Sequence, residues 1–169
     1  MKKHIELTGY GSGRTTTVGS LTGNLVELLS AMRADGRTLL TLAEFSDYRY
    51  VQVFVHSDGD VIGEVISNLN IQDMIAVEPW AEDKLRQIGF NEPAYGPNPN
   101  WWVRAHDDES YNDLVAKMNA AIFEALGEAP ANEVTVSTWD VDVPTGWTLD
   151  ELRESMRVYV EEGTGDLDD

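Results

Sequence analysis

Apolar side chains recur every three or four residues in three segments of the chain. This spacing brings them to one face of a helix, as expected where a helix packs on a core. A glycine follows each segment, at the position where a left-handed residue commonly closes a helix. The pattern therefore predicts three amphipathic helices, around residues 21–32, 79–88 and 108–126, which end at Gly36, Gly89 and Gly127.

β-Branched and aromatic residues dominate three other segments, at 38–45, 48–56 and 61–68. In a strand, successive side chains point to opposite faces, and residues of these types are favoured there. The second and third segments are separated by a turn with an Asp-Gly pair, a strong hairpin signal, and the first and second by a very short connection. The three segments are therefore expected to form an antiparallel meander.

The order of these elements predicts an α+β fold: helix, three-stranded meander, helix, strand and long helix. The fourth strand is expected at residues 101–105. A C-terminal extension adds a strand at 133–142 and a helix that carries Leu149 and Leu152. A capping box, Thr followed three residues later by Glu, opens that helix at Thr148.

Composition divides the chain into three parts. Residues 1–19 are rich in Gly, Ser and Thr and are predicted to be a flexible lead-in. Residues 20–127 contain the elements of the main α+β domain. Residues 128–169 are predicted to be an extension that packs on the same domain and ends in an acidic tail.

Charge and cysteine content exclude several classes of function. The 169 residues carry a formal net charge of −18, which disfavours binding to nucleic acids and to anionic membranes. The chain has no cysteine, so it has no disulfides and no thiolate metal site. No apolar run approaches the ~20 residues that span a bilayer, and no signal peptide is evident. We therefore expect a cytoplasmic protein.

No motif predicts a cofactor, a metal or a catalytic centre. The Gly-rich run at 9–13 lacks the Lys-Ser/Thr pair of a phosphate-binding loop, and no Gly-x-Ser-x-Gly occurs. The three histidines show no metal-ligand spacing. Asp58-Gly59-Asp60 lacks the remaining acidic positions of a calcium loop and is better interpreted as a turn. A non-enzymatic protein is expected.

The strand at 48–56 is the most informative segment for function. Alternation places Tyr50, Gln52 and Phe54 on one face and valines on the other, so both sides of the sheet carry apolar area. The helices of residues 20–127 are expected to cover one side. The other side is either a surface for a partner or is covered by the C-terminal extension, and the sequence leaves both alternatives open.

Two consecutive tryptophans, Trp101 and Trp102, lie in the fourth strand. They cannot both face one core, so one of them is either exposed to a partner or packs against the proline-rich loop before it. Together with Tyr50, Gln52 and Phe54, they are the candidate peptide-binding residues. An amide such as that of Gln52 could hydrogen-bond the backbone of an extended peptide.

Several short pieces of sequence follow one another in a characteristic order within residues 20–127. No single piece would identify a family, but their succession is moderately specific for one. The pieces are Tyr50-Val51-Gln52-Val53, Gly63-Glu64-Val65-Ile66-Ser67-Asn68, Leu85-x-x-Ile88-Gly89-Phe90, Pro93 and Pro99-Asn100-Trp101-Trp102.

This succession resembles the bacterial YbjN and type III secretion chaperone-like peptide-binding families, of the TY-Chap type. The resemblance implies a type III secretion chaperone-like fold and a non-enzymatic, often dimeric protein that binds a polypeptide client. The Gly-rich start and the segment after Gly127 depart from the pattern.

Two functions are therefore expected in order of preference. The first is a chaperone-like or peptide-binding module that uses the sheet face around Tyr50, Gln52 and Phe54. The second is an acidic regulatory or immunity-type protein that neutralises a basic protein target, because the charge of −18 would attract one.

Overall fold

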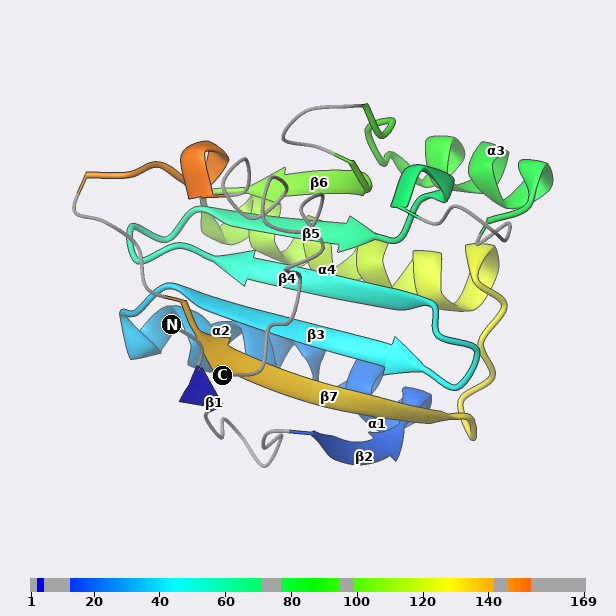
Figure 1. The fold of residues 1–169 in the computed structure, drawn as a ribbon, viewed down its shortest axis with the longest axis horizontal. Helices are drawn as coiled ribbons and strands as arrows, with labels where there is room; N and C mark the ends of the chain where they lie inside the picture. Colours follow the sequence, from blue (N-terminus) through cyan, green and yellow to red (C-terminus); the bar gives the residue numbers. More distant parts are fainter. Residues whose placement is uncertain (1–2, 5–12, 71–76, 95–98, 142–145, 153–169) are drawn as a thin grey trace.

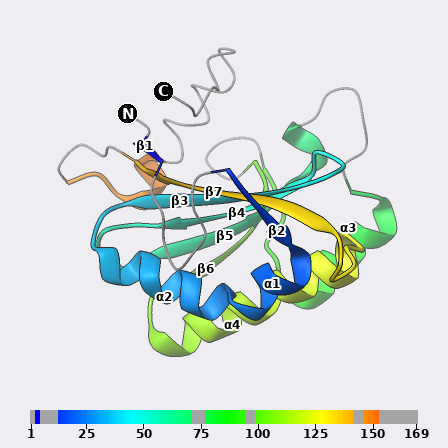
Figure 2. The same cartoon turned by 90° about the horizontal axis from the view of Figure 1, so that it is seen from below.

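One antiparallel sheet forms the centre of the molecule, and helices pack on one of its two faces (Figures 1 and 2). The structure is a computed structural model and describes residues 3–4, 13–70, 77–94, 99–141 and 146–152. The strands lie in the order β1-β7-β3-β4-β5-β6, and β2 also pairs with β7. Their bounds are β1 Lys3–His4, β2 Arg14–Thr17, β3 Leu39–Phe45, β4 Tyr50–Val55, β5 Val61–Val65, β6 Trp101–Ala105 and β7 Glu133–Asp140.

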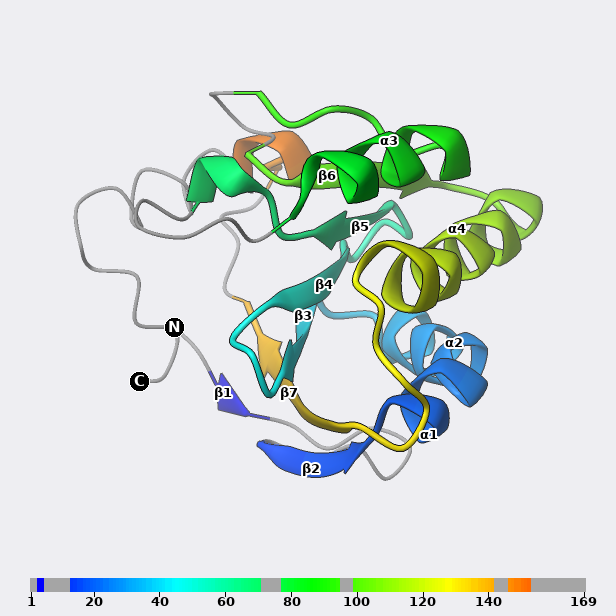
Figure 3. The same ribbon diagram turned by 90° about the vertical axis from the view of Figure 1, so that its right-hand side faces the viewer.

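Helices α1, α2 and α4 lie along the same face of the sheet, and α3 packs beside the end of α4 (Figures 2 and 3). The side chain of Thr17 caps α1 by accepting from Ser20 N, and Asp107 caps α4 in a reciprocal capping box with Ser110. The bounds are α1 Val18–Gly23, α2 Leu25–Asp35, a short 3₁₀ turn η1 Asn68–Asn70, α3 Pro79–Ile88, α4 Asp108–Ala120 and a π-helical continuation η2 Ala121–Ala125.

Two apolar clusters lie on opposite sides of the sheet. The larger one fills the space between the sheet and the helices and takes Val51, Val53 and Val55 from β4. The smaller one lies on the far side and takes Phe54 from the same strand. Side chains of β4 therefore alternate between the two clusters, as the period of a strand requires.

The sheet is larger than the three-stranded meander that the sequence predicts. Strands β3, β4 and β5 pair in succession, but β7 joins the other edge of β3 along its whole length. Residues 133–140, expected in an extension, are thus an inner strand of the sheet. The alternation of β7 predicts a strand, but its partner lies far away in sequence and is not predicted by local pattern.

Part of the expected lead-in at residues 1–19 is ordered. Arg14–Thr17 pairs with Glu133–Val136 as strand β2, and α1 begins directly after it at Val18. Four residues are too few to show a period, although Thr is favoured in strands. The predicted first helix is two helices, α1 and α2, which meet at Asn24. The acidic tail lies outside the described residues.

Candidate functional site

The sheet face opposite the helices carries two cross-strand rows of side chains. The first, here the apolar row, runs across four strands and is buried throughout. The second, here the polar row, lies two residues further along each strand and contains half-buried side chains. By the strand register, the apolar row is Trp139, Leu40, Phe54 and Ile62, followed by Arg104, and the polar row is Ser137, Leu42, Gln52, Glu64 and Trp102.

Residues 146–152, here the strap, cover the apolar row. Leu149 and Leu152 are 1% and 3% exposed and belong to the same cluster as Phe54. The strap ends in a helical turn, in which Thr148 Oγ1 accepts from Glu151 N at 3.2 Å. The second of the two alternatives left open by the sequence therefore holds for this part of the face.

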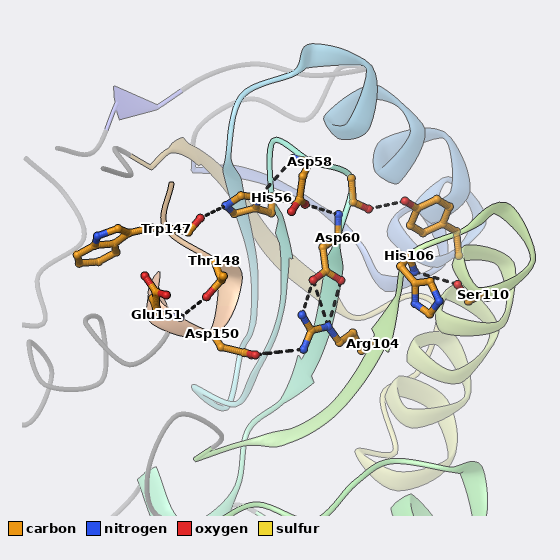
Figure 4. Close-up of polar contacts among 12 residues, drawn as sticks. His56, Asp58, Asp60, Arg104, His106, Ser110, Trp147, Thr148, Asp150 and Glu151 are labelled. Carbon is orange, nitrogen blue, oxygen red and sulfur yellow. Dashed lines mark hydrogen bonds and ion pairs between the residues drawn. The ribbon is translucent and has the colours of Figure 1, made fainter. Parts of the chain in front are cut away.

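Polar contacts join the strap to the edge of the sheet (Figure 4). The ring nitrogen Nε2 of His56 lies 3.0 Å from the carbonyl oxygen of Trp147. The guanidinium of Arg104 contacts Asp150 at 3.3 Å, and it also forms an ion pair with Asp60. The hydrogen bond to Asp60 is the main reason why the pKa of Arg104 is raised further above its usual value.

A buried carboxylate lies at the centre of the polar row. Glu64 is 2% exposed, and its two oxygens accept from Gln52 Nε2 and from Asn100 Nδ2, both at 3.2 Å. The same Asn100 amide lies 3.4 Å from the hydroxyl of Tyr50. A buried polar group requires such donors, because burial without them is costly. The polar row thus combines a buried carboxyl group with the flanking surfaces of Gln52 and Trp102.

The same network holds the ends of two strands together. Asn100 Oδ1 accepts from Ser67 N at 3.2 Å, and the hydroxyl of Ser67 donates to Pro99 O. Next along the chain, the Asn68 side chain both donates to and accepts from the backbone of Val77, at 2.8 and 2.9 Å. Two of the quoted sequence pieces, 63–68 and 99–102, therefore meet in space.

The five predicted site residues do not share one surface. Tyr50, Gln52 and Trp102 are half-buried, whereas Phe54 is 3% exposed beneath the strap. Trp101 is 1% exposed and lies in the helix-side cluster. The two tryptophans thus face opposite sides of the sheet, as the alternation requires. A peptide-binding role for these residues remains a prediction.

Sequence reasoning missed Glu64, Asn100 and Arg104. The signal for Glu64 was present, since alternation places it on the same face of the strand as Ile62, two residues before it. The approach of Asn100 and Arg104 depends on the pairing of β5 with β6, which local pattern does not predict.

A concave region lies beside α3. This cleft has a volume of about 200 Å³ and is lined by the side chains of charged, polar and aromatic residues. Within the described ranges, Trp101 Nε1 is buried with no hydrogen-bond acceptor. The lining residues are Asn68, Leu69, Glu82, Arg86, Glu92, Pro93 and Trp101.

The described residues contain neither a metal-binding cluster nor a membrane-spanning helix. Among them, no three His, Cys, Asp or Glu side chains gather in a way that could hold a metal ion. None of the helices in this part of the chain has the length and apolar character needed to cross a membrane.

Comparison with known protein families gave a match. A family model described as "T3SS (YopN, CesT) and YbjN peptide-binding chaperone 3" (TY-Chap3) matches residues 19–144. The match continues beyond the predicted boundary at residue 127 and includes β7. No curated protein and no solved structure matched the chain.

Proposed function

Because this chain belongs to the family of T3SS (YopN, CesT) and YbjN peptide-binding chaperones, we propose that it holds polypeptide clients, without catalysis, on the sheet face opposite its helices. The polar row is the observation that supports this location. Gln52 and Trp102 are half-buried there, on either side of the buried Glu64. The helix-side face, in contrast, is filled by α1, α2 and α4.

The chemistry of the polar row suits an extended peptide. The amide of Gln52 can exchange its contact with Glu64 for a peptide carbonyl, and the indole of Trp102 offers a flat apolar surface. Tyr50 lies at the start of the same strand. Phe54 becomes available only when the strap moves, and Trp101 belongs to the other side of the sheet. A second copy of the chain, the other partner that the resemblance implies, would compete with clients if it used this face.

The experiment uses peptides selected from a random phage-displayed library on the purified full chain, with affinity then measured by fluorescence anisotropy. Gln52→Leu and Trp102→Ala are expected to weaken binding by about tenfold or more, the range of interface hot spots. Trp80→Ala is the matched control, because Trp80 is 60% exposed on α3, away from the polar row. Thermal melts verify that each variant is folded. Equal losses in Trp80→Ala and Trp102→Ala, or no selected peptide, would overturn the proposal.

A further inference from the structure

The strap has the features of a bound ligand rather than of a core element. It contributes two apolar side chains, Leu149 and Leu152, to a cluster whose other members come from the sheet and its margin. Around them, Asp150 and Glu151 are exposed. Its sequence Leu-Asp-Glu-Leu therefore presents apolar residues at positions i and i+3 and a carboxylate at i+1.

The sheet supplies a matching receptor for each of these groups. The apolar row receives the two leucines, and Arg104 receives the carboxylate of Asp150 at 3.3 Å. The ring of His56, itself 8% exposed, contacts the backbone of the strap at Trp147 O (Figure 4). Although the chain has a net charge of −18, Arg104 at the edge of the sheet provides a positive group that can bind a carboxylate.

These contacts are few for the length of chain that they order. Ordering seven residues has a large entropic cost, and an ion pair as exposed as Arg104–Asp150 contributes little. Asp150 is 54% exposed in that pair. The strap is therefore a segment that a competing ligand could replace without disturbing the helix-side core.

We propose that the strap is a built-in competitor for the client site, and that clients carry, next to the extended stretch on the polar row, a helical turn with the same pattern: apolar residues at i and i+3 and a carboxylate at i+1. This inference rests on the proposed function and adds to it a client class and a means of regulation. A client displaces the strap, takes the apolar row and pairs its carboxylate with Arg104. While the strap is in place, its high effective concentration keeps weak ligands out.

The test uses a fluorescently labelled synthetic peptide that copies residues 141–160 of the chain. The receptor is the full chain, either unchanged or with Leu149→Asp and Leu152→Asp, which detach its own strap. We expect the doubly substituted receptor to bind the peptide at least about tenfold more tightly than the unchanged chain, because the competitor is removed. A peptide with the same two substitutions is expected not to bind. Equal binding of the unsubstituted peptide by both folded receptors, or binding of the substituted peptide by either receptor, would overturn the inference.

A second pair of receptors covers the case in which the double substitution unfolds the chain. Asp150→Asn and Glu151→Gln each remove one negative charge from the strap, but of these two side chains only Asp150 contacts Arg104. Asp150→Asn is expected to bind the peptide about two- to fivefold more tightly than Glu151→Gln, the range of a surface ion pair. No difference between them would overturn the inference.

The outcomes also separate this inference from the proposed function. If foreign peptides bind and their affinity is the same in all strap variants, the strap is not a competitor, but the chain still binds clients. If the copied peptide binds only when the strap is detached while no foreign peptide binds at all, the competitor holds and the client-binding proposal fails.

Discussion

Gly63 is a position at which β5 comes close to the side chains of α4. A Cβ atom at this position would lie 2.8 Å from Met118 Sδ, closer than Cβ atoms come to other atoms in real structures, and 3.3 Å from Met118 Cγ. Met118 is 1% exposed, so its side chain would have to shift within the buried core. The absence of a side chain at Gly63 therefore allows α4 to pack close to the sheet, on the face opposite the polar row.

We expect Gly63→Ala to lower the free energy of unfolding by about 1–3 kcal/mol, the usual cost of overpacking a core. Urea denaturation would measure the loss. In a Met118→Ala background the penalty should largely disappear, because the clashing atoms are gone. Gly23→Ala is the matched control: nothing lies within 4 Å of its Cβ, so the substitution should be neutral or slightly stabilising. A loss of similar size at both glycines would contradict this explanation.

At single positions, the sequence predicts which face a side chain takes but not what covers it. The alternation of β4 correctly separates Phe54 from its valine neighbours, because the period of a strand is a local property. The cover over Phe54 comes from Leu149 and Leu152, and the donors of Glu64 come from two other segments. Such contacts depend on long-range pairing, which is why the candidate site was only partly predictable.

Among the elements, the turn between β3 and β4 is joined to the end of the long helix by Arg49. Its guanidinium donates to Leu126 O at 2.6 Å and contacts Glu128 at 3.1 Å and Asp47 at 2.6 Å. The side chain of Glu128 is only 7% exposed. Leu126 and Glu128 directly follow the π-helical η2, so the Arg49 contacts fix the chain at the end of that helix.

Arg49→Ala is expected to lower the free energy of unfolding by about 2–4 kcal/mol, since it removes the donor of the Leu126 carbonyl and leaves the buried Glu128 with Asn132 Nδ2 but without its cationic partner. Arg37→Ala removes a comparable set of contacts to Asp35 and Asp140, but its side chain is 44% exposed. That variant should lose less than about 1 kcal/mol. Chemical denaturation of the two variants side by side tests the difference, and equal losses would show that burial of the Arg49 contacts is unimportant.

The N-terminal cap of α4 should make the stability of the protein depend on pH. The backbone N–H of Ser110 hydrogen-bonds the Asp107 carboxylate and lowers its pKa. The pKa of Asp107 in the folded state therefore lies below its unfolded value of about 3.9, so the ionised carboxylate stabilises the fold at pH values above about 3.9. This stabilisation is lost as the pH falls through the folded-state pKa. The cap is thus strongest at neutral pH.

We expect Asp107→Ala to lower Tm at pH 7, and the difference from the unchanged chain to shrink as the pH is lowered below about 3.9. Thermal melts by circular dichroism across this range provide the measurement. Glu109→Ala removes a carboxylate from the same helical turn without removing the cap and serves as the control. A difference in Tm that stays constant with pH would show that the capping contact does not depend on the charge.

Elements were predicted better than their partners. The segments that form α3, α4, β4 and β6 are marked by caps, glycines and alternation, all of which act over a few residues. The place of β7 beside β3 and the pairing of β2 are not marked in this way, because an edge strand accepts any strand of suitable length. The lead-in was therefore assigned too little structure, whereas the strand and the helical turn of the extension were predicted but not their places in the fold.

For the whole molecule, the charge of −18 separates the two functions considered for this chain. If clients bind through the apolar and polar rows, most of the affinity comes from buried surface and short-range contacts, which salt screens weakly. If an acidic surface instead captures a basic target, long-range attraction accelerates the encounter, and screening removes that acceleration.

Stopped-flow measurements of peptide association distinguish the two functions. The rate constant for a selected peptide and the full chain is measured at about 10 mM and about 150 mM ionic strength, between which the Debye length falls from about 30 to about 8 Å. We expect the association rate constant to change by less than about threefold for a client of the sheet face. Over the same interval Tm should rise, since salt weakens the repulsion among the acidic side chains of the folded chain. A rate that falls by tenfold or more, together with equal affinity for Gln52→Leu and the unchanged chain, would favour the acidic regulatory function instead.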